Sequence, residues 1–172
     1  VGIVTCGKAH LDFLEALRRL ELPLEALAAA GVRVYKVGLV FPIEPQRMRA
    51  FAAGLEELLV VEEKAPVVEN QIRALLYNLA PDARPRVLGK LDAEGGALLP
   101  ATGELRPSRV MPVLADWLAR HAPGLDRRER VPAFVATPVL ANDADGVRRV
   151  PYFCAGCPHN LSTHVPEGSE AP

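Results

Sequence analysis

The chain has 172 residues, enough for one ordinary domain with its own core and a shorter appendage. A net charge of −1 gives no electrostatic reason to expect nucleic acid or an anionic membrane as partner, and no apolar run is long enough to span a bilayer. The odd number of cysteines, three, argues against a disulfide framework and favours a reducing cytoplasm.

An alternation of buried strands and amphipathic helices is predicted through the first 121 residues. Strands are expected at 2–7, 32–40, 58–62 and 86–89, and helices at 10–20, 24–30, 46–55, 67–79 and 107–121. The strand at 58–62 is apolar on both faces, which is typical of a central parallel strand. The order of elements predicts a three-layer α/β domain, with a mostly parallel sheet flanked by helices.

The composition changes after Pro123, where prolines become frequent and the apolar periodicity fades. We interpret 122–150 as an inter-domain linker that begins with a charge run at 126–130. Residues 151–172 are interpreted as the start of another domain. Because the chain begins inside a strand and ends without a closing element, we expect it to be a piece of a longer protein.

Two thiols at C-x-x-C spacing, Cys154 and Cys157, dominate the chemistry of the last stretch. Thiolates at this spacing suit a metal ion or an iron–sulfur cluster. Covalent haem is excluded, because Pro158 stands where the histidine of that motif is required. Zinc held with His159 or His164, an iron–sulfur cluster with ligands from beyond the chain, and an idle turn remain open alternatives.

Two other motifs match known sites only in part. The run 2–8 satisfies seven positions of a phosphate-binding loop, but Ala9 replaces the hydroxyl residue and the middle of the run is a strand. The 143–146 stretch resembles the centre of a calcium loop, yet Ala141 and Tyr152 occupy positions that require ligands. We therefore expect neither a phosphate site nor a calcium site.

Charged residues lie at the carboxyl end of the third predicted strand: Glu62, Glu63 and Lys64. In open α/β sheets this end of the strands is where ligands and partners bind, whereas the simpler interpretation is a solvated ion pair. The same two interpretations apply to 102–104. Cys6, at the end of the first strand, is expected to be a small buried residue and not a nucleophile.

A resemblance to a known family extends over nearly the whole chain. The blocks 152–163 and 165–169 resemble the opening of the thiamine-diphosphate-binding domain of fused bacterial indolepyruvate ferredoxin oxidoreductases, of the 2-oxoacid:ferredoxin oxidoreductase superfamily. The stretches 2–8, 35–38, 60–64 and 99–105 are similar to the preceding domain of that family, which resembles the C-terminal domain of transketolase.

The resemblance implies a function for the parent protein. The family converts an arylpyruvate or similar 2-oxoacid and coenzyme A to an acyl-CoA and CO₂, using thiamine diphosphate with Mg²⁺, and passes electrons through [4Fe–4S] clusters to ferredoxin. Cys154 and Cys157 match cysteines that ligate the cluster nearest thiamine diphosphate, and His159 matches a residue close to that cofactor. Ala155 and Leu161 depart from the usual residues without affecting this chemistry.

The residues that hold Mg²⁺ and diphosphate and that activate the thiamine ring are missing from the chain, so the isolated piece is expected to be inactive and free of these cofactors. Its expected role is a scaffold for the remaining domains of the parent chain, within a cytoplasmic homodimer. The competing hypothesis is a free-standing, metal-stabilised α/β binding or adaptor module without redox activity.

Overall fold

A computed structural model describes residues 1–132, 153–162 and 168. The chain forms two compact units, Val1–Thr137 and Pro138–Pro172. The strands of the first unit are β1 (Gly2–Cys6), β2 (Arg33–Val37), β3 (Glu57–Val61) and β4 (Arg86–Leu88). Its helices are α1 (Gly7–Arg19), α2 (Leu24–Ala29), α3 (Pro45–Ala52), α4 (Val67–Leu76) and α5 (Pro107–His121).

The four strands form one sheet in the order β2-β1-β3-β4, and every neighbouring pair is parallel. In this register Ile3 lies between Val34 and Leu59. Every residue of β1 and β3 is buried, because both faces of the central strands are covered. The predicted parallel α/β fold is confirmed.

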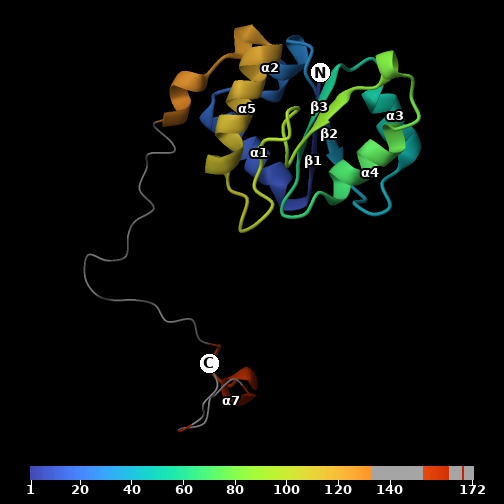
Figure 1. Cartoon of the computed structure of the whole chain (residues 1–172). Coiled ribbons are helices and arrows are strands. Elements are labelled where there is room, and N and C mark those ends of the chain that lie inside the picture. Colours follow the sequence, from blue (N-terminus) through green and yellow to red (C-terminus); the bar gives the residue numbers. More distant parts are fainter. Residues whose placement is uncertain (133–152, 163–167, 169–172) are drawn as a thin grey trace. The chain divides into compact units, whose positions relative to one another are not determined.

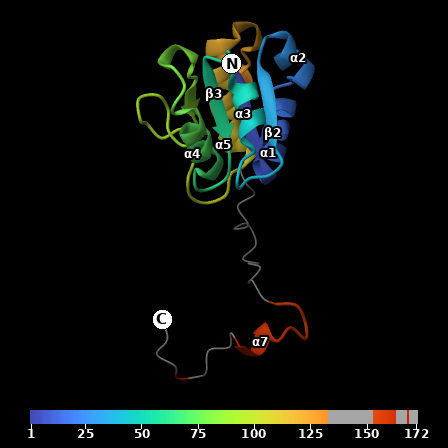
Figure 2. The same ribbon diagram turned by 90° about the vertical axis from the view of Figure 1, so that its right-hand side faces the viewer.

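Helices cover both faces of the sheet (Figures 1 and 2), with α1 and α5 on one side and α3 and α4 on the other. Alternate strand residues point to opposite sides, which divides the core into two clusters. Ile3 and Leu59 pack with the α1 and α5 side, whereas Val4 and Val60 pack with the α3 and α4 side.

A buried carboxylate joins α5 to the start of β3. Glu57 is 2% exposed and accepts hydrogen bonds from the indole nitrogen of Trp117 at 2.7 Å and from the His121 ring at 2.9 Å. Arg86 of β4 adds an ion pair at 3.2 Å. These partners satisfy the buried charge, so the helix is held by directed bonds as well as by apolar contacts.

Element boundaries differ from the expected ones where backbone geometry decides them. Helix α1 begins at Gly7, three residues before the predicted start, because a φ of +48° at this glycine turns the chain directly from strand into helix. Strand β2 ends at Val37 instead of residue 40, since its partner β1 ends at Cys6 in this register.

The segment after α5 starts with two short 3₁₀ turns, Pro123–Leu125 and Arg128–Arg130. Leu125 belongs to the core, and Arg130 pairs with Glu21 at 2.6 Å. The predicted linker therefore begins with residues packed on the domain, while its part from 133 to 150 lies outside the described residues. The domain boundaries at 121 and 150 stay predictions.

Across the parts of the chain that the structure describes, none of the helices combines the length and the apolar character needed to cross a membrane.

The core makes a direct prediction for two leucines of α1. Leu17 is 2% exposed and Leu11 is 64% exposed. Leu17→Ala should lower the free energy of unfolding by about 2–5 kcal/mol, because it removes buried methyl groups and leaves a cavity. Leu11→Ala, the matched control, should change it by less than about 0.5 kcal/mol. Urea denaturation followed by circular dichroism measures both, and equal effects would contradict the assigned core.

Candidate functional site

The carboxyl ends of β1 and β3 form the place where a ligand site is expected. In the order β2-β1-β3-β4, the chain leaves β1 toward one edge of the sheet and later continues from β3 toward the other. Loops diverge at such a switch point, and open α/β sheets commonly bind ligands in the crevice between them. Here Lys8 follows β1, and Glu62 and Glu63 follow β3.

Glu62 is a buried helix cap. Its side chain is 3% exposed, and its two carboxylate oxygens accept the backbone N–H groups of Val68 and Glu69, each at 2.8 Å. These amides belong to the first turn of α4, where N–H groups have no partner within the helix. The interpretation of Glu62 as part of a solvated ion pair is therefore wrong. Its carboxylate is buried and interacts with the N–H groups at the start of α4, where a negative charge is favourable.

A second buried carboxylate lies beside this cap. Glu69 is 3% exposed, accepts the backbone N–H of Lys90 at 2.9 Å and pairs with Arg73 at 2.8 Å. The carboxylate passes so close to Gly89 that a Cβ atom there would lie 2.2 Å from one of its oxygens. A side chain at this position would have to displace the Glu69 carboxylate from its present place.

The Lys90 side chain completes the buried polar group. It is 6% exposed, and its ammonium donates to the backbone carbonyls of Glu62 and Pro100. Burial lowers the pKa of Lys90, and the negative charges of Glu62 and Glu69 oppose that shift. Lys90 thereby ties the ends of β3 and β4 to the chain that follows them.

Cys6 belongs to this interior and not to an open site. It is 9% exposed and packs in the core cluster with Val4 and Val60. Burial raises the pKa of the Cys6 thiol, the charge of Glu62 raises it further, and Lys90 opposes both. A thiol with a raised pKa is a poor nucleophile, so the expectation of a small buried residue is confirmed.

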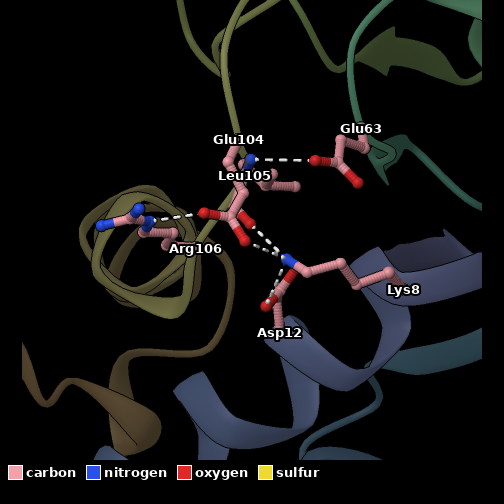
Figure 3. Close-up of polar contacts among 6 residues, drawn as sticks. All are labelled: Lys8, Asp12, Glu63, Glu104, Leu105 and Arg106. Atoms are coloured by element: carbon pink, nitrogen blue, oxygen red, sulfur yellow. Dashed lines mark hydrogen bonds and ion pairs between the residues drawn. The ribbon is translucent and has the colours of Figure 1, made fainter. Parts of the chain in front are cut away.

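The segment around Leu105 lies between Lys8, which follows β1, and Glu63, which follows β3 (Figure 3). Leu105, 1% exposed, donates its backbone N–H to Glu63 at 3.4 Å and accepts a hydrogen bond from the Lys8 ammonium at 2.7 Å. The same ammonium pairs with Asp12 at 2.9 Å and with Glu104 at 3.6 Å. The Lys8 ammonium is thus bonded to protein oxygens.

The 102–104 stretch remains at the surface, as the simpler interpretation expects. All three residues are exposed, and Glu104 pairs with Arg106 at 2.8 Å as well as with Lys8. The Arg106 guanidinium lowers the pKa of Glu104. Exposed pairs of this kind contribute little to stability. The segment is therefore held mainly by the hydrogen bonds of the buried Leu105 backbone to Lys8 and Glu63.

A histidine of α1, His10, contacts a residue near the end of β1. The Thr5 hydroxyl, 1% exposed, lies 2.8 Å from Nδ1 of His10. Burial lowers the pKa of His10, and the positive charge of Lys36 lowers it further. The neutral ring is therefore favoured at pH 7, and its bond to Thr5 fixes its orientation on α1.

The predicted ligand residues of the second unit lie on a tight turn. Cys154 is exposed and Cys157 is half-buried, and both are free thiols. The Cys157 N–H donates to the Cys154 carbonyl at 3.0 Å, and Gly156 supports the turn with a φ of +80°. Asn160, in the short helix α7 (His159–Ser162), donates to the same carbonyl at 3.0 Å.

The His159 ring lies 5.2 Å from the Phe153 ring, centroid to centroid. Within residues 1–132, 153–162 and 168, no group of three or more His, Cys, Asp or Glu side chains could hold a metal ion. The roles of Cys154, Cys157 and His159 stay predictions, and His164 and the turn at 143–146 lie outside the described residues.

Comparison with known proteins assigns a family to most of the chain. The model of the indolepyruvate oxidoreductase domain matches residues 1–137. Three archaeal proteins called indolepyruvate oxidoreductase subunit IorA are similar. The one from Thermococcus kodakarensis is 26% identical over 166 residues, which cover 94% of this chain and 22% of that protein. The one from Archaeoglobus fulgidus is 29% identical over 169 residues, covering 96% and 22%.

The third, from Methanothermobacter marburgensis, is 30% identical over 159 residues, covering 92% of this chain and 21% of that protein. The chain thus spans about a fifth of the length of the curated relatives it matches. No solved structure matches the chain.

The cap on α4 yields a prediction. Glu62→Ala should lower the free energy of unfolding by about 2–5 kcal/mol, because it leaves two helix N–H groups without their acceptor and removes one of the negative charges near the buried Lys90. Glu63→Ala, the control, removes one long bond at 3.4 Å and should cost less than about 1 kcal/mol. Chemical denaturation compares them, and similar losses would show that Glu62 is not the cap.

Proposed function

The chain belongs to the indolepyruvate oxidoreductase domain family, and on this premise we propose that it is the scaffold portion of an indolepyruvate oxidoreductase. The observation that carries the proposal is the family match over residues 1–137, together with relatives of that name along nearly the whole chain. The parent enzyme would catalyse CoA-dependent oxidative decarboxylation of indolepyruvate or a related arylpyruvate. Ferredoxin would accept the electrons.

The packing at the carboxyl ends of β1 and β3 supports a scaffold role for the α/β domain. The backbone of Leu105 bridges Lys8 and Glu63 at the carboxyl ends of β1 and β3, the end of the strands at which such sheets commonly bind ligands. The nearby thiol of Cys6 is buried and protonated at neutral pH, because burial raises its pKa. The role of the domain is thus to hold the neighbouring domains in position, while the reaction takes place elsewhere in the parent protein.

The turn at Cys154 and Cys157 is proposed to supply two ligands of a [4Fe–4S] cluster. Both thiols are free, and the hydrogen-bonded turn between them holds them on one short segment, which suits two neighbouring ligands. The remaining ligands must come from other parts of the parent protein. Such a cluster accepts electrons one at a time and passes them on.

His159 is proposed to lie close to thiamine diphosphate in the parent enzyme. Its ring contacts that of Phe153, which gives the imidazole a support at the start of α7. The residues that would hold thiamine diphosphate, its Mg²⁺ and coenzyme A belong to other parts of the parent chain. A homodimer in the cytoplasm, with ferredoxin as electron acceptor, is the assembly we propose.

The scaffold role predicts that this chain alone binds neither thiamine diphosphate with Mg²⁺ nor coenzyme A. Titration calorimetry of the 172-residue chain with each compound should give no measurable heat of binding. A micromolar dissociation constant, about −8 kcal/mol, would reveal a binding site within these residues and contradict the proposed division of labour.

The ligand assignment predicts the effect of replacing either terminal thiol in the complete enzyme. Cys154→Ala or Cys157→Ala should lower the cluster's iron occupancy and the rate of ferredoxin reduction by more than about tenfold, because one ligand is lost. Cys6→Ala is the control, since this buried thiol contacts core residues and should leave iron and activity unchanged. Iron analysis and a reduction assay measure the outcome.

Two results would contradict the assignment. Full iron content and activity in the Cys154→Ala enzyme would show that the thiol is no ligand. Loss of zinc in place of iron would show that the turn belongs to a structural metal site and carries no electrons.

A further inference from the structure

An apolar ridge stands at the surface where the chain leaves β2. Leu39, Val40 and Phe41 are 61%, 36% and 74% exposed, and Val67 at the start of α4 is 44% exposed. We call these four residues the apolar ridge. The run from Val37 to Ile43 contains no charged residue, although charged side chains flank it on both sides.

One side chain holds the ridge together. The amide nitrogen of Gln71 donates to the backbone carbonyls of Val40 and Val67, each at 2.9 Å, and its oxygen accepts the N–H of Ile43 at 2.9 Å. Val40 and Val67 are therefore neighbours in space despite their separation in sequence. Because Ile43 also packs against the core, the loop is fixed before any partner arrives. A preorganised surface loses little entropy on binding.

Exposed apolar side chains elsewhere in the described residues are arranged differently. Within residues 1–132, Leu11, Leu24, Tyr77 and Leu91 are far apart along the chain, and single exposed apolar residues of this kind are common in folded proteins. Tyr77 is in addition covered on one face by the Arg84 guanidinium, 5.5 Å from its ring centroid. The apolar ridge differs from them, because Leu39, Val40 and Phe41 are consecutive and Gln71 joins them to Val67, and such a group of uncharged exposed side chains indicates an interaction surface.

We propose that the apolar ridge is the surface on which another domain of the longer parent polypeptide packs, through an uncharged apolar face of its own. The inference rests on the proposed scaffold function, since a scaffold requires such a contact. The curated relatives provide the chain length for it, because about four-fifths of each lies outside the region matched here.

The size of the ridge favours a domain of the same polypeptide over a second copy. A stable complex between separate chains buries about 800 Å² on each partner, more than four side chains supply. A covalently linked domain is held at a high effective concentration, so that a small apolar contact suffices.

Hydroxyl-radical labelling of the complete polypeptide tests the proposal. Phe41 and Tyr77 are matched aromatic probes, 74% and 70% exposed in this structure. After normalisation to the reactivity of each free amino acid, Phe41 should be labelled at least about fivefold more slowly than Tyr77, because a packed interface excludes water. Equal normalised rates would show that the ridge is uncovered and would overturn the proposal.

Dilution and substitution identify the occupant. The slow labelling of Phe41 should persist at concentrations where sedimentation shows single polypeptides. Protection that disappears on dilution would assign the ridge to a second copy and overturn the inference.

Phe41→Asp should split thermal unfolding of the complete polypeptide into separate transitions, whereas the matched Tyr77→Asp variant should unfold like the wild type. Unchanged unfolding of Phe41→Asp would also count against it.

Labelling and unfolding are measured without substrate, so they do not depend on the proposed activity. A protein in which Phe41 is protected but indolepyruvate is not oxidised would retain the interface and lose the enzymatic proposal. A protein that oxidises indolepyruvate with Phe41 fully labelled would show the reverse.

Discussion

The carboxylate of Glu62, just after β3, is the constraint on which the structure at the carboxyl ends of β3 and β4 depends. It binds the first free N–H groups of α4, so the direction of that helix is fixed by the strand that precedes it. The backbone carbonyl of Glu62 receives the Lys90 ammonium, which reaches on to Pro100. Helix α4, strand β4 and the following chain are therefore positioned by one residue and its neighbours.

This arrangement has a functional consequence. Glu62 and Lys90 are both buried, and each is already bonded to two backbone groups, so neither is presented at the surface to a substrate. Beside them, the backbone of Leu105 is hydrogen-bonded to both Lys8 and Glu63. The polar residues of this edge maintain the fold of the domain, and the exposed ridge at Phe41 is the part of the surface left for a neighbour.

Local pattern was sufficient to predict the layers of the fold. The buried run around Val60 and the apolar spacing of α5 with proline at its start each identify an element by periodicity or a terminal signal. The ligand turn at Cys154 was likewise recognised from spacing, and its role stays a prediction.

The contacts across the edge could not be predicted in this way, because they join residues far apart in sequence. Lys8 and Leu105 are separated by 97 positions, and Glu69 and Lys90 by 21. Periodicity reports which face of an element is buried and carries no information about which loop returns to cover it. One signal in the sequence was Gly89, directly after β4. A glycine beside a strand often marks a place where another group comes close to the backbone, and here that group is the Glu69 carboxylate.

The buried charges around Lys90 affect how the stability of the domain changes with temperature. Ions are hydrated with a strongly negative entropy, so the cost of removing them from water falls as temperature rises. The group formed by Glu62, Glu69 and Lys90 is more than nine-tenths buried at each member. Its contribution to stability therefore grows on warming, in the range where the gain from apolar packing no longer increases, and the loops at this edge should be among the last parts of the domain to melt.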